Sequence, residues 1–307
     1  MIILTGIITN KYLSLASIYK QNNMVNNFLV QHISKGTGRF FASASIAISI
    51  LSTIGLSSSR VWADYVYTNN IPSLAQTDIQ AINKQGASID NVVFPLNGGF
   101  GIVYGTYGYY TSFLPQELLN DLSTINKQKL TINSIVFTPS GQWLVIYGKN
   151  GFYRSTNFPQ DVTNALLQIN KQNFTINSVA FTPYGGWVII YGGNGSYQSQ
   201  SNIPQALSNK IVDINKAKQT IKYITFTNNG EWIIIYDQGN SRGNAAFWSK
   251  NFPQQVITAI NKIYADSGQI TTIAFTPEVL NVKKNPIKIA QNMVLLGEGL
   301  KYISLIM

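Results

Sequence analysis

The chain has 307 residues, of which 45% are hydrophobic and 11% charged, and its formal net charge is +10. The apolar fraction is large enough for a sizeable core, in one large domain or two ordinary ones. The sequence has no cysteine, and its only histidine is His32. This composition excludes a disulfide framework and a thiolate metal site, so we expect no metal and no cofactor.

The N-terminal segment 1–63 has the layout of a secretory signal. Lys35 and Arg39 precede an apolar run over 40–56, and Ala63 closes a Val-Trp-Ala tripeptide that suits a signal peptidase. We expect cleavage after Ala63, with Met24 as a second possible start, and a product exported to the periplasm or the cell exterior. The alternative is an uncleaved membrane anchor, because about 17 apolar residues nearly span a bilayer.

Three sequence markers recur at intervals of about 44 residues through 64–307. One is a proline, at Pro72, Pro115, Pro159, Pro204 and Pro253. The second is Ile-Asn-Lys, which ends at Lys84, Lys127, Lys171, Lys216 and Lys262. The third is a phenylalanine, at Phe94, Phe137, Phe181, Phe226 and Phe275. Such a period indicates propellers, solenoids or arrays. We therefore predict a single repeat domain of five units, at 64–107, 108–150, 151–195, 196–243 and 244–307.

Each unit is predicted to contain one helix and three strands. In the third unit, apolar residues between Pro159 and Lys171 fall on one helical face. Residues 176–181 alternate in hydrophobicity, 187–191 form a continuous apolar run, and Asn-Gly at 194–195 signals a hairpin. These patterns predict a helix followed by a first, a middle and a third strand.

The two ends of the domain are offset from whole units. Residues 64–69 resemble a third strand, whereas the fifth copy has a degenerate middle strand at 293–298 and a weak third strand at 301–304. This offset favours a ring in which 64–69 pairs with the fifth unit, because an open solenoid would more naturally consist of whole units with polar caps.

The segment from Ile176 to Trp187, with the turn at Asn194-Gly195, resembles the inner hairpin of a WD40-type β-propeller blade. Gly-His and Trp-Asp dipeptides are absent, and a helix takes the place of the outer strand. The resemblance implies a five-bladed β-propeller-like ring of three strands and one outer helix per repeat. The alternative is a pentein-like αβ-propeller, in fold only, because pentein enzymes rely on Cys and His. Neither resemblance implies a function.

The residues of 64–307 do not form a recognisable catalytic constellation. A nucleophilic triad or a zinc site lacks its His and Cys, and the carboxylates are scattered among helices and turns. We expect an exported, non-enzymatic binding or scaffold protein whose partner is a glycan or an envelope protein surface. The alternative is a carbohydrate-active enzyme that uses paired carboxylates. No basic stripe suggests nucleic acid, and we expect membrane contact only if the N-terminal segment is uncleaved.

Two repeated sets are candidates for ligand binding. The Ile-Asn-Lys lysines would lie on one rim of a ring and could meet an anionic surface. They would equally serve as caps of helix C-termini, where Asn170 and its counterparts could adopt a left-handed conformation. The second set is the aromatics of the third strands, which flank turns: Tyr110, Tyr153, Tyr197 and Trp248. The aromatics of the middle strands are expected to pack between units.

Overall fold

The computed structural model describes residues 63–67, 71–239, 243–265, 268–277 and 293–298, with side chains for all of these except 63–67 and 293–298. These elements belong to one compact unit, Val61–Met307. The predicted export signal, apart from Ala63, and the predicted strand at 301–304 lie outside the described residues. Among the described helices, none combines the length and the apolar character that crossing a bilayer requires.

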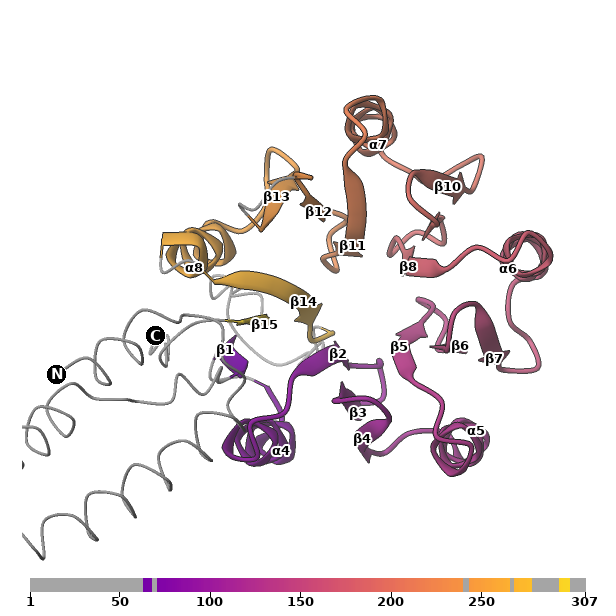
Figure 1. Cartoon of the computed structure of the whole chain (residues 1–307), viewed down its shortest axis with the longest axis vertical. Helices are drawn as coiled ribbons and strands as arrows, with labels where there is room; N and C mark the ends of the chain where they lie inside the picture. The colour runs from indigo at the N-terminus through magenta and orange to yellow at the C-terminus, as the bar shows by residue number, and fades with distance from the viewer. Residues whose placement is uncertain (1–62, 68–70, 240–242, 266–267, 278–292, 299–307) are drawn as a thin grey trace, which may run out of the picture. The chain divides into compact units, whose positions relative to one another are not determined.

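The described strands form five antiparallel sheets of three strands each (Figure 1). From here on, a unit is one sheet together with the helix that precedes its first strand. The first strands are β2 (Ile89–Val93), β5 (Ile132–Phe137), β8 (Ile176–Phe181), β11 (Thr220–Phe226) and β14 (Gln269–Phe275). The middle strands are β3 (Phe100–Tyr104), β6 (Trp143–Tyr147), β9 (Trp187–Tyr191), β12 (Trp232–Asp237) and β15 (Met293–Glu298). The third strands are β4 (Gly108–Ser112), β7 (Gly151–Arg154), β10 (Gly195–Gln198), β13 (Asn244–Trp248) and β1 (Ala63–Tyr67).

The fifth sheet combines the two ends of the domain. β1 pairs antiparallel with β15, with Ala63 opposite Glu298, and β15 pairs in turn with β14. This confirms the prediction that the strand near residue 64 completes the fifth unit and that 293–298 is its middle strand. The five sheets are separate, and no sheet of the described strands closes on itself. The sequence-based prediction of repeated three-stranded units with one helix each is therefore confirmed.

A helix of twelve residues precedes each first strand, and the five helices are α4 (Ser73–Lys84), α5 (Gln116–Lys127), α6 (Gln160–Lys171), α7 (Gln205–Lys216) and α8 (Gln254–Ala265). In α4 to α7 the repeated proline is the N-cap residue, as in Pro159 with φ −53°. Proline suits this end of a helix because the first N–H groups have no partner within the helix.

At the C-termini of α4 to α7, the left-handed residue is not the asparagine that the sequence suggested. Asn170 remains helical, and the left-handed residue is Asn173, three positions later, with φ 58°. The N–H of Asn173 bonds to the carbonyl of Asn170 and the N–H of Phe174 to that of Ile169. This is a Schellman motif. Gly86, Lys129 and Lys218 hold the same left-handed position in the other three units.

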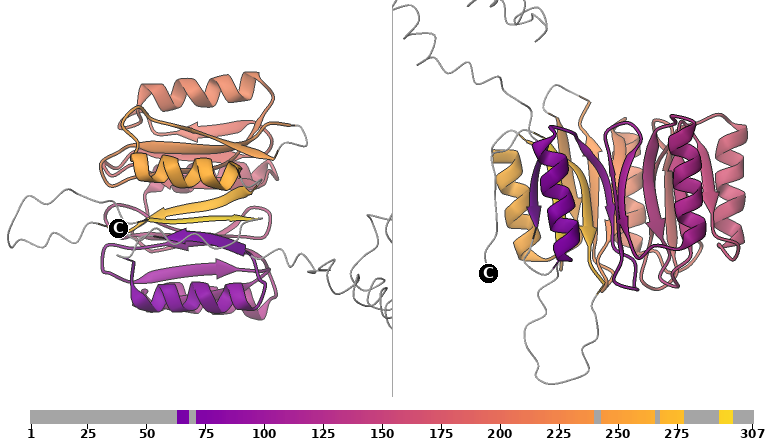
Figure 2. Two further views of the ribbon diagram at one scale, coloured as in Figure 1. Left: turned by 90° about the vertical axis from the view of Figure 1, so that its left-hand side faces the viewer. Right: turned by 90° about the horizontal axis from the view of Figure 1, so that it is seen from below.

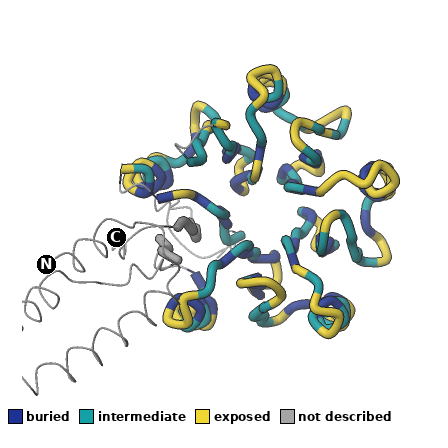
Figure 3. The backbone as a smooth tube through the Cα atoms, viewed as in Figure 1, coloured by how far each residue is buried: buried dark blue, intermediate teal, exposed yellow. Residues whose placement is uncertain are grey.

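The first strands lie at the inside of the assembly and the helices at the outside (Figure 1). The helices run alongside the strands of their units (Figure 2). Consecutive first strands contact each other, and β14 of the fifth unit contacts β2 of the first. The burial pattern follows this arrangement, because each helix is buried on its inner side and exposed on its outer side (Figure 3).

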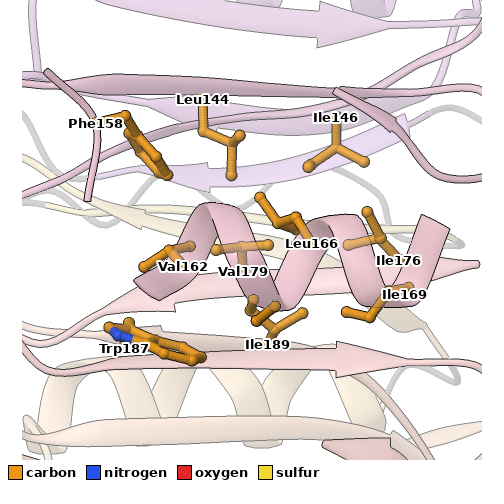
Figure 4. Close-up of a cluster of buried hydrophobic side chains, with 11 residues drawn as sticks. Leu144, Ile146, Phe158, Val162, Leu166, Ile169, Ile176, Val179, Trp187 and Ile189 are labelled. Carbon is orange, nitrogen blue, oxygen red and sulfur yellow. The ribbon is translucent and has the colours of Figure 1, made fainter. Parts of the chain in front are cut away.

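The hydrophobic core consists of five clusters, and each cluster spans two consecutive units. In the cluster shown in Figure 4, Leu144 and Ile146 of β6 pack against Val162 and Leu166 of α6 and against Trp187 of β9. Because β3, β6, β9 and β12 are covered on both faces in this way, their apolar side chains are buried along most of each strand. Ala274 of β14 joins the cluster of the first unit in the same manner.

Candidate binding faces and the central cavity

Each first strand has a β-bulge near its start, where one residue is left out of the pairing with the middle strand. The bulged residues are polar in every unit: Asp90, Asn133, Asn177, Lys222 and Thr271. A bulge leaves one residue out of the ladder, bends the strand and changes the direction of the bulged side chain. Asn133 and Asn177 thereby donate to the carbonyls of Gly148 and Gly192, at 2.6 and 2.8 Å.

The residue after the bulge links one unit to the next. The Oδ1 of Asn91 accepts from the N–H of Ile135 at 2.9 Å, and the Oγ of Ser178 accepts from the N–H of Ile224 at 3.2 Å. Tyr223 makes the corresponding link by donating its hydroxyl to the carbonyl of Ile273 at 3.0 Å. Burial raises the pKa of Tyr223, so this hydroxyl remains a donor at neutral pH.

A cavity of about 560 Å³ is lined by parts of all five first strands and the turns that follow them. This volume falls within the usual range of ligand sites. Its wall combines small and apolar side chains such as Val136, Ala180 and Thr225 with the polar bulged residues. The cavity can therefore accept a ligand that has both apolar and hydrogen-bonding groups.

The alternating direction of the strands gives the domain two different faces. The helix C-termini, the starts of the first strands and the turns between middle and third strands lie together at one face. Hydrogen bonds join these parts: Asn126 at the end of α5 donates to the carbonyl of Tyr107, and Asn194 donates to that of Asn215. We call this the basic face, after its lysines Lys84, Lys127, Lys129, Lys149, Lys171, Lys216, Lys218 and Lys222. The helix N-termini and the turns between first and middle strands form the opposite face.

The opposite face carries large exposed apolar side chains next to the cavity. Leu96, which lines the cavity, is 63% exposed, and Phe113 is 78% exposed. The two segments are joined, because Nδ2 of Asn97 donates to the carbonyl of Phe113 at 2.8 Å. Tyr184 of the third unit, also at this face, is 67% exposed, and its hydroxyl donates to the carbonyl of Asn229.

Phe113 has a left-handed backbone conformation, with φ 53°. Asn202 holds the same place after the third sheet, with φ 64°. Asn157 and Asn251 stand at the same distance from the repeated proline after the second and fourth sheets, but they do not have a positive φ. Asn tolerates this region, whereas a bulky residue there is unusual and strained. A large aromatic residue that is both strained and exposed has no role in folding that we can identify. Sequence reasoning missed Phe113, although comparing it with the three Asn residues could have revealed it.

The third-strand tyrosines proposed as ligand contacts are half-buried and stacked on tyrosines of the middle strands. The ring centroids are 5.2 Å apart for Tyr110 and Tyr104, 5.1 Å for Tyr153 and Tyr147, and 5.1 Å for Tyr197 and Tyr191. Burial, followed by the stacked partner, raises the pKa of Tyr147. One ring face of each third-strand tyrosine is therefore covered, which leaves less surface for a stacked sugar than the sequence suggested.

Trp248 is not the counterpart of these tyrosines. Tyr153 pairs with Val145, and the equivalent pair in the fourth unit is Phe247 with Ile234. Trp248 is one residue further along and so points to the other side of the strand, where it packs against the core cluster of the fifth unit. Phe247 is 40% exposed, and the Nζ of Lys210 lies 4.1 Å from its ring centroid.

The Ile-Asn-Lys lysines are exposed in all five units. Four of them are the last residue of their helix, but Lys262 lies three residues before the end of α8. The prediction of five equivalent positions is therefore wrong for the fifth unit, where the motif is shifted by about one helical turn. Two of the asparagines before these lysines fasten helix ends to the neighbouring unit: Asn126 donates to the carbonyl of Tyr107 at 2.9 Å, and Asn170 donates to that of Asn150 at 3.3 Å.

The first aromatics of the middle strands lie in the core, with Trp143, Trp187 and Trp232 at most 7% exposed, whereas the tyrosines that follow them are partly buried. Trp187 also donates its indole N–H to Asp161 on α6 at 2.6 Å. Asp161 in addition accepts from the N–H of Val162 at 2.9 Å. This acidic residue thus joins the first turn of its helix to the middle strand of the same unit.

The acidic side chains of the described residues offer little for catalysis or metal binding. No group of three or more potential metal ligands occurs within the described part of the chain. Burial raises the pKa of Asp78, and burial followed by the charge of Glu117 raises that of Asp121. Both residues are on helices and outside the cavity lining, so the shifts reflect partial burial on the outer surface.

Comparisons with known proteins add little to this description. No known protein family model matches the chain, and no curated protein matches it. The chain is similar to a solved structure described as "YCF48 bound to D1 peptide", with 11% sequence identity and a TM-score of 0.23, over 70% of this chain and 79% of that chain. At this level of similarity, the match supports no statement about fold or function.

Proposed function

We propose that the domain is an exported, non-enzymatic binding module built as a closed five-bladed propeller. Closure is supported by the contact between β14 and β2, by Ala274 in the core cluster of the first unit, and by a cavity lined by all five first strands. The WD40-type resemblance of the inner hairpin agrees with this assembly.

We further propose that the ligand is an apolar segment of another protein, bound at the opposite face around Leu96 and Phe113. The observation that carries this proposal is Phe113, which is 78% exposed and strained at a position where other units have Asn. Exposed apolar side chains that gather beside a cavity are typical of protein-binding sites. A glycan is less favoured, because the third-strand tyrosines have one ring face covered.

The test is selection of a phage-displayed library of random peptides on the full chain, together with a glycan array. We expect apolar peptides to be enriched and to bind the Phe113→Asn variant about ten-fold or more weakly. The matched control is Phe174→Asn, an exposed aromatic on the basic face, which should bind the same peptides normally. Enriched peptides that ignore Phe113→Asn would overturn the site, and glycan binding without peptide binding would favour a lectin-like module.

A further inference from the structure

The lysines of the domain are concentrated on one face. Twelve Lys and Arg residues have described side chains, and eight of them form the basic face defined above. The acidic residues near this face are Asp90, Asp213 and Asp237, and Lys222 pairs with Asp237 at 3.8 Å. The other seven lysines form no ion pair within the part of the chain that the structure describes. The opposite face has Glu117, Asp161 and Glu231, so charge is separated along the domain.

Two exposed aromatic side chains accompany these lysines. Tyr107, in the turn between β3 and β4, is 41% exposed, and Phe174, in the loop after α6, is 45% exposed. The Phe174 ring lies 5.8 Å from that of Tyr191, which holds it at the surface. Lysines interspersed with exposed aromatics are typical of surfaces that rest on lipid headgroups, since the rings enter the interface while the cations meet anionic lipids.

The direction of β1 provides a third and independent observation. Ala63 pairs with Glu298, and β15 runs as a middle strand that ends at the basic face. The chain therefore enters the domain at this face, and the apolar run 40–56 lies a few residues earlier in the sequence. In the uncleaved chain, which keeps residues 40–56, a lipid bilayer fits both this entry point and the lysines, whereas a soluble polyanion would account for the lysines alone.

We infer that the basic face lies against a membrane surface that contains anionic lipids. The contact is electrostatic and shallow: the lysines at the helix C-termini meet headgroups, and Tyr107 and Phe174 reach the interface. The opposite face, with Leu96 and Phe113, then points away from the membrane. This inference does not depend on the proposed ligand, because the two surfaces share no residue.

Two lysines of the basic face can be replaced by glycine without introducing backbone strain. Lys129 and Lys218 have left-handed conformations, with φ 54° and 56°, at the position that Gly86 holds in the first unit. Glycine adopts this conformation at no steric cost. The double variant Lys129→Gly with Lys218→Gly therefore removes two cations while relieving strain, so that weaker binding cannot be attributed to unfolding.

The first experiment is co-sedimentation of the full chain with vesicles of phosphatidylcholine alone or mixed with phosphatidylglycerol. We expect the anionic vesicles to be preferred and the preference to fall with salt. The double glycine variant should lose about thirty-fold in affinity for anionic vesicles, at about 1 kcal/mol per lysine. The control Arg154→Gln with Lys250→Gln, which removes two cations from the opposite face, should change affinity less than about two-fold.

The second experiment addresses orientation directly, even if residues 40–56 bind every vesicle. Vesicle-bound full chain is acylated with a water-soluble amine reagent, and the modified lysines are located by mass spectrometry. We expect Lys127, Lys129 and Lys218 to be protected and Lys250 to remain reactive. Equal modification of both faces would overturn the inference, as would stronger binding to a soluble anionic polysaccharide or nucleic acid than to anionic vesicles.

Discussion

The side-chain oxygen of Asn91 accepts a hydrogen bond from the backbone N–H of Ile135, which follows it by 44 residues and belongs to the next unit. This bond is buried, and its counterparts at Ser178 and Tyr223 join later pairs of units. The period of the sequence is therefore also the period of the contacts between units. At three of the five bulges, the polar residue just after the bulge makes the connection between neighbouring sheets.

Replacing Asn91 by Ala should destabilise the domain by about 1–3 kcal/mol, because the N–H of Ile135 would be left buried without its acceptor. Urea denaturation of the two proteins measures this. Asn120→Ala is the control, since the exposed side chain of Asn120 accepts a hydrogen bond only from Gln116 on its own helix. A loss no larger than that of the control would mean that water or a neighbouring group replaces the bond.

Closure of the propeller can be tested by overpacking two equivalent alanines. Ala180 is 5% exposed at the junction of the third and fourth units, and Ala274 is 6% exposed at the junction of the fifth and first. If both junctions are closed in solution, Ala180→Leu and Ala274→Leu should each cost about 1–3 kcal/mol. A normal cost at Ala180 with almost none at Ala274 would show that the ring is open.

The strain at Phe113 predicts an increase in stability upon mutation. Phe113→Asn should stabilise the domain by about 1 kcal/mol, because Asn tolerates the left-handed region and the exposed ring contributes little packing. The reverse change, Asn202→Phe, should destabilise by a similar amount. Thermal unfolding of both variants measures the difference. A destabilised Phe113→Asn protein would show that the ring has a structural role.

The contact between Asp161 and Trp187 should stabilise the third unit. Asp161→Ala removes the acceptor of the indole N–H and of the Val162 N–H, and should cost about 1–2 kcal/mol. Glu117→Ala, at the same position of α5, serves as the control, and a change within about 0.5 kcal/mol is expected there. Equal losses in the two variants would indicate that only the charge at the helix N-terminus matters.

The raised pKa of Asp121 predicts that the stability of the domain depends on pH. Its pKa is raised in the folded domain by burial and by Glu117, so its ionised form is less favourable there than in the unfolded chain. The contribution of this group is thus greatest below its ordinary pKa of 3.8 and is lost as pH rises through the raised value. Asp121→Asn should therefore be more stable than the native domain at neutral pH, with a difference that shrinks in acid. A constant difference across pH would contradict this.

Much of the fold could be predicted from local patterns. The helix over 160–171, the strand over 187–191 and the turn at Asn194-Gly195 follow from hydrophobic periodicity and from turn residues, which act over a few positions. The pairing of β1 with the fifth unit followed from the offset of the repeat, because a third strand at the start of the domain needs a middle strand elsewhere to pair with.

The candidate surfaces depended on relationships that local patterns do not contain. Trp248 and Tyr153 look alike in sequence, yet strand register places them on opposite sides of their sheets, because side chains alternate with a period of two. Similarly, Asn170 appeared suited to a left-handed turn, but α6 continues through Lys171 and the left-handed residue is Asn173.

The sequence alone therefore determined the repeating unit, its helix and strands, and the strand that completes the fifth sheet, because these depend on periodicity and chain order. Only the tertiary structure revealed the central cavity, the separation of charge between two faces and the exposure of Phe113. These features arise from residues of different units, and their positions relative to one another are fixed by strand register and by packing between sheets.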